Sequence, residues 1–164
     1  MADADDKRRG EELGWGILEG SVGPRVRLPR NVLGARSIAV SAPHALPTGS
    51  LTVLALIAAN PGRSQSALAD RAGLNKSALV GIVDQLERRG LVERDRVAND
   101  RRRYQVSVAP AGERAMNELF AAVTREEEPI REALGARDMH ALLALLDRAV
   151  AALEGGRRGA EGPD

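Results

Sequence analysis

The sequence predicts a mostly α-helical fold with a small β-hairpin, a winged helix-turn-helix flanked by N- and C-terminal dimerisation helices. Three observations carry this prediction. Residues 64–88 show helical periodicity interrupted by Gly73, residues 91–108 contain two short β-type stretches, and residues 137–153 form an amphipathic helix with an unusually wide apolar face. Aromatic residues make up only 2% of the chain, so the core must be aliphatic, which favours packed helices.

The helix-turn-helix is predicted between Ser64 and Gly90. Ser64 or Ser66 can cap a short first helix, and Gly73 ends it because glycine tolerates the left-handed backbone of a tight turn. Asn75 caps the second helix, and Gly90 ends it at the C′ position. The apolar positions of the second helix follow the spacing of a single helical face: Leu79, Ile82, Val83 and Leu86.

A β-hairpin, the wing, is predicted next, with strands over residues 91–96 and 104–108. The second stretch alternates apolar and polar side chains, and Asn99-Asp100 gives a turn signal between the two strands. The connecting loop carries three consecutive arginines at positions 101–103. A hairpin tip of this composition favours contact with a polyanion over simple solvation.

Charge is unevenly distributed, although the formal net charge is only +1. Between residues 88 and 103 arginines far outnumber acids, whereas acids outnumber bases between residues 113 and 154. A basic face on an otherwise balanced protein is the electrostatic footprint expected for duplex DNA. The pattern therefore predicts double-stranded DNA as a partner.

Several classes of site are excluded or disfavoured by composition. The chain has no cysteine, which excludes disulfides, thiol catalysis and cysteine metal sites. Its only histidines, His44 and His140, lack the spacing of metal ligands, so neither a metal nor another cofactor is expected. No arrangement of catalytic residues stands out either, so an enzyme is not expected. No apolar run is long enough for a membrane span and no signal peptide is evident, so a cytoplasmic location is expected.

The remaining chain is predicted to consist of helices and tails. Disordered tails are expected at residues 1–10 and 155–164. Three regions are expected between these tails. They are N-terminal dimerisation and pocket helices at 11–45, the winged helix-turn-helix at 46–111, and C-terminal dimerisation helices at 112–154. A helix is expected from Pro47 to Ala59, and another from Pro110. Pro24 is expected near a helix start, with breaks or kinks at Pro29 and Pro129.

The wide apolar stripe at residues 137–153 indicates a partner helix from a second subunit, since one small core needs a narrower face. The alternative is an intramolecular bundle with the first helix. A homodimer is the favoured interpretation.

The sequence resembles the MarR (multiple antibiotic resistance regulator) family of bacterial transcription factors. The matching pieces are LTVLALIAANPGRSQSALADRAGLNKSALVGIVDQLERRGLVERD and NDRRRYQVSVAPAGERAM, and the resemblance is dense from Leu46 to Met116. The triplet Asp100-Arg101-Arg102 is similar to the family's wing signature, and Pro110-Ala111-Gly112 to its exit into the next helix.

The resemblance implies a homodimer that presents one recognition helix per subunit to the major groove and a wing arginine to the minor groove. It implies that Asp100 pairs with a basic residue at the wing base, for which Arg94 is the expected partner. It also implies a ligand pocket between the dimerisation helices and the DNA-binding lobe. The sequence departs from the family in its recognition helix, where Ala78, Val80 and Gly81 replace polar side chains.

The predicted DNA-binding residues lie at the starts of the two helices, along the recognition helix and in the wing: Ser64, Gln65, Asn75, Lys76, Ser77, Gln85, Arg94, Asp100, Arg101, Arg102 and Arg103. Candidate effector-binding residues are Trp15, Arg27, Arg30 and His44. In one interpretation His44 and Arg30 or Arg27 hold a carboxylate. In the other, His44 lies on a surface loop, the arginines pair with the glutamates at 126–128, and Trp15 packs into the dimer interface.

These expectations combine into one function: a ligand-responsive homodimeric DNA-binding regulator. We expect a repressor released from a pseudo-palindromic operator by a small aromatic carboxylate or a related compound, with half-sites about one helical turn apart. The alternative function is a winged-helix module that binds protein and has no ligand response.

Overall fold

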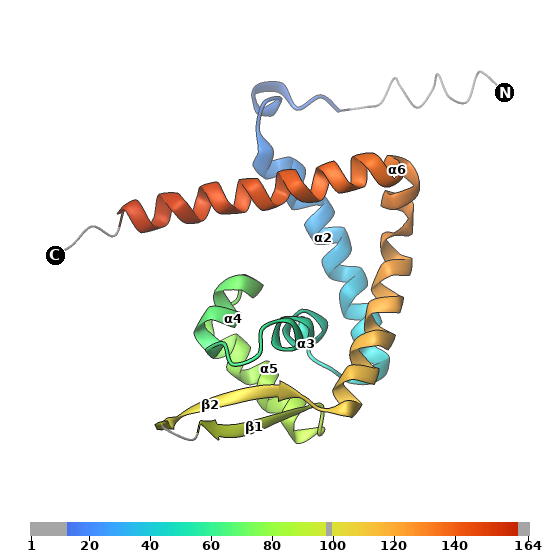
Figure 1. The fold of residues 1–164 in the computed structure, drawn as a ribbon. Helices are drawn as coiled ribbons and strands as arrows, with labels where there is room; N and C mark the ends of the chain where they lie inside the picture. Colours follow the sequence, from blue (N-terminus) through green and yellow to red (C-terminus); the bar gives the residue numbers. More distant parts are fainter. Residues whose placement is uncertain (1–12, 98–99, 161–164) are drawn as a thin grey trace. The chain divides into compact units, whose positions relative to one another are not determined.

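The computed structural model describes residues 13–97 and 100–160, and the side chains of residues 13–94 and 105–153 (Figure 1). The chain divides into two compact units, Met1–Arg36 and Ser37–Asp164, and each is described by itself. The predicted tail at residues 1–10 lies outside the described residues.

The N-terminal unit contains a 3-10 turn, η1 (Gly16–Leu18), and most of helix α2 (Val22–Ser41). Pro24 lies in the first turn of α2, as predicted. The expected break at Pro29 is wrong, because α2 continues through that residue. A proline removes one backbone hydrogen bond and costs about 3 kcal/mol, which the remaining turns of a 20-residue helix can offset.

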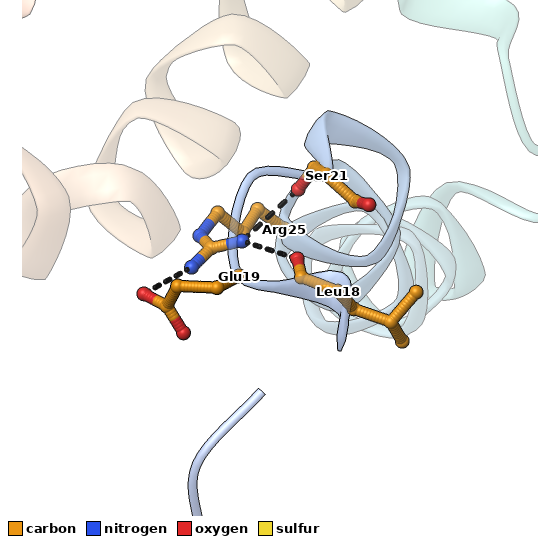
Figure 2. A network of polar contacts seen from close by, with 4 residues as sticks. All are labelled: Leu18, Glu19, Ser21 and Arg25. Carbon is orange, nitrogen blue, oxygen red and sulfur yellow. Dashed lines mark hydrogen bonds and ion pairs between the residues drawn. The ribbon is translucent and has the colours of Figure 1, made fainter. Parts of the chain in front are cut away.

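Arg25 joins η1 to the first turns of α2 (Figure 2). Its guanidinium donates hydrogen bonds to the carbonyl oxygens of Leu18 at 3.1 Å and Ser21 at 3.0 Å, and to the carboxylate of Glu19 at 3.2 Å. The same group lies 5.0 Å from the centre of the Trp15 ring, in a cation–π contact. One arginine therefore binds a carbonyl at the end of η1 and another just before α2, and it contacts the indole.

The second unit begins with three short helices, α3 (Ser50–Ala59), α4 (Gln65–Ala72) and α5 (Lys76–Arg88). The predicted caps are confirmed: the Ser64 hydroxyl accepts from the Ala67 N–H at 3.2 Å, and the Asn75 side chain accepts from the Ala78 N–H at 2.8 Å. Gly73 has a φ of 66°, the left-handed conformation that was expected to end α4.

Helix α3 starts later than the sequence predicts. Gly49 has a φ of 90° and forms its N-terminal cap, so Pro47 and Thr48 belong to the preceding turn. The hydroxyl of the fully buried Ser50 donates to the Pro47 carbonyl at 2.7 Å. The turn requires a positive φ, which Gly49 adopts without strain, and this moves the helix start by three residues relative to the prediction.

The core of this unit lies where α3, α4 and α5 meet the hairpin and the first part of α6. It is aliphatic, as the shortage of aromatic residues predicted. Its fully buried large side chains come from α3, α5, β1 and α6: Val53, Leu54, Leu79, Val83, Leu86, Val92 and Leu119. Burying each such side chain contributes about 1.5–3 kcal/mol, so this cluster fixes the orientation of α5.

The hairpin consists of strands β1 (Val92–Val97) and β2 (Asp100–Val108), paired antiparallel. The register sets Val92 opposite Val108 and Arg94 opposite Val106, with an irregularity between Arg96 and Val97. The second strand begins four residues earlier than expected, so positions 101–103 lie on β2 rather than in a loop. The hydrogen bonds between two strands join backbone groups, so a run of charged side chains does not stop the strands from pairing.

Helix α6 (Pro110–Ala160) starts at Pro110 as predicted and comprises two helical parts that meet at Gly135 (Figure 1). The sequence placed this break at Pro129, which is wrong. Gly135 has φ 68° and ψ 171°, a backbone conformation essentially restricted to glycine, so the chain turns there. The helix also runs to Ala160, past the predicted start of the C-terminal tail at 155, because adding a turn to an existing helix is easier than nucleating one.

Candidate DNA-binding interface

Helix α5 presents one buried face and one exposed face. Leu79, Ile82, Val83 and Leu86 are buried against the core. On the opposite side Lys76, Ser77, Gly81 and Arg88 are exposed, and Val80 and Gln85 are half-buried. The second helix of a helix-turn-helix is the one that enters the major groove. The predicted readers Lys76 and Ser77 therefore lie where they can reach base edges, in the first turn of this helix.

The side chains of Ser64 and Asn75 have a structural task in addition to the predicted DNA contact. Each accepts a backbone N–H three residues ahead, at the N-terminus of α4 or α5. Each cap satisfies one of the four N–H groups that a helix start leaves open. The remaining amides, together with exposed Lys76 and half-buried Gln65, form a place where a phosphate can bind.

Arg94 connects the hairpin to the recognition helix. It lies on β1, and its side chain is only 22% exposed. It forms ion pairs with Asp84 and Glu87 of α5, and the distance from its Nε atom to the Oε2 atom of Glu87 is 3.4 Å. Neither acid was predicted as a partner, because both ion pairs depend on how α5 packs against β1. The register sets the backbone of Asp100 opposite Val97, three residues from Arg94. The pairing of Asp100 with Arg94 stays a prediction, since the Asp100 side chain lies outside the described residues.

This geometry predicts a positioning role for Arg94, because it pairs with two carboxylates on the helix that is expected to face DNA. Arg94→Gln is expected to weaken DNA binding about tenfold, since unpaired carboxylates near phosphates repel them. The measurement is a fluorescence anisotropy titration of a promoter duplex.

The control for this prediction neutralises the two carboxylates and tests whether DNA affinity returns. Adding Asp84→Asn and Glu87→Gln to the Arg94→Gln variant removes the repulsion and should recover most of the affinity. If the triple variant binds as weakly as the single one, Arg94 instead contacts DNA directly, as the sequence suggested.

The wing residues occupy the tip half of the hairpin. The backbone of Asp100–Arg103 belongs to β2, which pairs with β1. The side chains of Arg101, Arg102 and Arg103 lie outside the described residues, so their DNA contacts stay predictions.

The candidate effector residues are divided between the two units. Trp15, Arg27 and Arg30 belong to the N-terminal unit, where Trp15 contacts Arg25 and both other arginines are exposed on α2. His44 belongs to the second unit. A shared pocket for these residues stays a prediction. Of the glutamates proposed as alternative partners for the arginines, Glu127 pairs with Arg131 of its own helix at 3.1 Å.

His44 lies in a 3-10 turn, η2 (Ala42–His44), which adjoins both the recognition helix and α6. Its carbonyl accepts a hydrogen bond from Arg89 at the end of α5, at 3.2 Å. Its Nδ1 atom lies 3.9 Å from the carboxylate of Glu118 on α6. The turn that carries His44 is therefore fixed to the C-terminal end of the helix that would read DNA. The sequence had indicated neither contact, since both join distant segments.

Two other features limit the classes of site. Among the described residues, no cluster of three histidine, cysteine or acidic side chains could hold a metal ion. Over the same part of the chain, no helix has both the length and the apolar character to cross a membrane.

Comparison with known proteins agrees with this interface. Residues 46–103 match the model of the MarR family. A putative transcriptional regulatory protein for the hcr operon of Thauera aromatica is 34% identical over 139 residues, which cover 84% of this chain and 83% of that protein.

Solved structures extend the similarity over most of the fold. The transcriptional repressor CouR bound to a 23-mer DNA duplex is 31% identical, with a TM-score of 0.73, covering 85% of this chain and 99% of that one. CouR bound to p-coumaroyl-CoA is 30% identical, with a TM-score of 0.65 and coverage of 83% and 96%. NadR in complex with 4-hydroxyphenylacetate is 27% identical, with a TM-score of 0.68 and coverage of 79% and 92%.

The capped helix pair, the antiparallel wing and the basic residues around them thus occur in a chain whose relatives regulate transcription. The protein is a DNA-binding transcriptional regulator with a winged helix, and it belongs to the MarR family.

Proposed function

We propose that this regulator is a homodimeric repressor, released from a pseudo-palindromic operator by a small aromatic carboxylate or a related compound such as its thioester. The observation that carries the proposal is the 31% identity to a DNA-bound repressor over 99% of that chain. Similar chains bind p-coumaroyl-CoA and 4-hydroxyphenylacetate, which share an aromatic ring and an acyl group.

The apolar surface of α6 supports a dimer. Beyond Gly135 this helix exposes large aliphatic side chains: Leu143, Leu145, Leu146, Val150 and Leu153. A monomer rarely exposes a contiguous apolar stripe of this kind. A second copy of the chain covers it, and sedimentation analysis at micromolar concentration should give twice the mass of the 17.4 kDa chain.

The direct test of the function is a gel shift on the DNA upstream of the protein's own gene. Specific retardation that is lost as salt rises is expected, because phosphate contacts release counterions. Addition of 4-hydroxyphenylacetate, p-coumarate or p-coumaroyl-CoA should release the DNA. Binding without release by any aromatic acid or thioester contradicts the effector class, and absence of binding contradicts the operator.

Arg30 and His44 are proposed to hold the effector's carboxylate or thioester carbonyl. Arg30→Ala or His44→Ala should raise the effector concentration for half-release about tenfold, because a charge-assisted hydrogen bond contributes about 1.5–3 kcal/mol. DNA affinity without effector should change little, since the His44 carbonyl that accepts from Arg89 is retained. The measurement is an anisotropy titration of the protein–DNA complex with effector.

The control is Arg114→Ala, an exposed arginine on α6. It should leave the release curve unchanged. An unaltered response in both Arg30→Ala and His44→Ala removes these residues from the pocket.

A further inference from the structure

We propose that the middle turn of α5 recognises the methyl group of a thymine in the major groove, with Val80 making the apolar contact and Gly81 allowing the helix to approach the base edge closely. The proposal rests on the DNA-binding function and specifies what part of the operator this chain reads.

Among the described residues, none gives a structural reason for the glycine at position 81. It lies inside α5 with an ordinary helical backbone, so no positive φ demands a glycine. A Cβ atom built at this position meets nothing within 4 Å, so no neighbour demands a small residue. Glycine in a helix interior is less stable than alanine. A residue that weakens its own helix without an internal reason points to an external surface that approaches it.

Two polar side chains of the helix-turn-helix are engaged within the protein. Asn75 uses its side chain to cap the helix, and Asp84 pairs with Arg94, so neither is free to read a base in the middle of the helix. The exposed polar readers, Lys76 and Ser77, lie in the first turn. Val80, half-buried beside Gly81, is the apolar group that the next turn offers to the groove.

The base edges in the major groove differ in their chemistry. In the major groove adenine, guanine and cytosine present donors and acceptors, whereas thymine also presents a C5-methyl group. An apolar side chain on a recognition helix matches that methyl group and none of the other base edges. A helix without a side chain at Gly81 can bring Val80 within contact distance of it.

The experiment is a double-mutant cycle between protein and DNA. In the upstream duplex that the protein binds, each thymine is replaced singly by deoxyuridine, which removes only the methyl group. For the wild-type protein, one position in each half-site should lose about fourfold in affinity, the value of one buried methyl group. For Val80→Ala the same replacement should cause no further loss.

The matched control is Val123→Ala, a half-buried valine on α6, which should keep the full sensitivity to deoxyuridine. The proposal is overturned if every thymine replacement affects wild type and Val80→Ala equally. Failure of the wild type to bind any upstream duplex is a different result, since it contradicts the proposed operator, on which this reading of the bases rests.

Gly81→Ala gives a second, independent readout. The free protein should melt about 4 °C higher, since alanine favours the helix and its Cβ has open space. Its affinity for the same duplex should fall about tenfold, because the added methyl group separates the helix from the base edge. A variant that is more stable and binds DNA as tightly as wild type contradicts the close approach.

Discussion

Charge reversal at Arg101 and Arg102 is expected to reduce affinity for the upstream duplex by at least about 100-fold at 0.15 M salt. The double variant Arg101→Glu/Arg102→Glu removes two cations from the wing and adds two anions where a narrow minor groove carries strong negative potential. A loss of about 1.4 kcal/mol of binding free energy at each of the two positions already lowers the affinity about 100-fold. The second wing of a dimer would add to this loss. Anisotropy titrations at several salt concentrations measure both the affinity and its salt dependence.

The salt dependence separates a local loss of contacts from a folding defect. Fewer phosphate contacts make the slope of log affinity against log salt shallower. The control is Arg114→Glu/Arg125→Glu, which reverses two exposed arginines on α6 and should bind nearly as wild type does. Normal DNA binding by the wing variant would refute the assignment of the wing and favour a protein-binding module.

Gly112→Ala is expected to destabilise the second unit by about 3 kcal/mol or more, a value typical of severe overpacking. Gly112 is buried in the first turn of α6, and a Cβ atom there would lie 2.0 Å from the carbonyl oxygen of Leu91 and 2.8 Å from a methyl group of Val108. That carbonyl is fixed, because it accepts the N–H of Ala109 at 3.0 Å. The helix must therefore move away from the hairpin. Thermal and urea unfolding followed by circular dichroism measure the loss.

Gly34→Ala is the matched control, since a Cβ atom at this position on α2 meets nothing within 4 Å. It should leave stability unchanged or raise it by up to about 1 kcal/mol. Equal stability of Gly112→Ala and wild type would mean that the junction between α6 and the hairpin adapts to the added methyl group.

The helix-turn-helix was predictable because its signals are local. Ser64 and Asn75 each cap a helix through an N–H only three residues away, and Gly73 alone determines the turn between the helices. The same locality explains the errors. Pro129 is a strong helix breaker by its own chemistry, but the bend lies at Gly135, and a glycine inside a helical pattern signals a bend only through its backbone angles.

The site was predictable only in part, because some of its contacts join distant segments. Arg94 was recognised as a basic residue near the wing, but its partners Asp84 and Glu87 depend on how α5 packs against β1. The contact between Arg89 and the carbonyl of His44 spans 45 residues and involves a backbone atom, which side-chain patterns do not encode. The position of Lys76 in the exposed first turn of α5, in contrast, follows from the cap that precedes it.

The contact between Arg25 and Trp15 has a spectroscopic consequence. Trp15 is the chain's single tryptophan, and it belongs to the N-terminal unit, 38% exposed beneath a guanidinium. Its emission therefore reports changes around that unit, whereas the helical signal in circular dichroism comes mainly from the second unit. Melting curves from the two signals coincide only if both units unfold together. The single native tryptophan therefore serves as an intrinsic fluorescent label for the N-terminal unit.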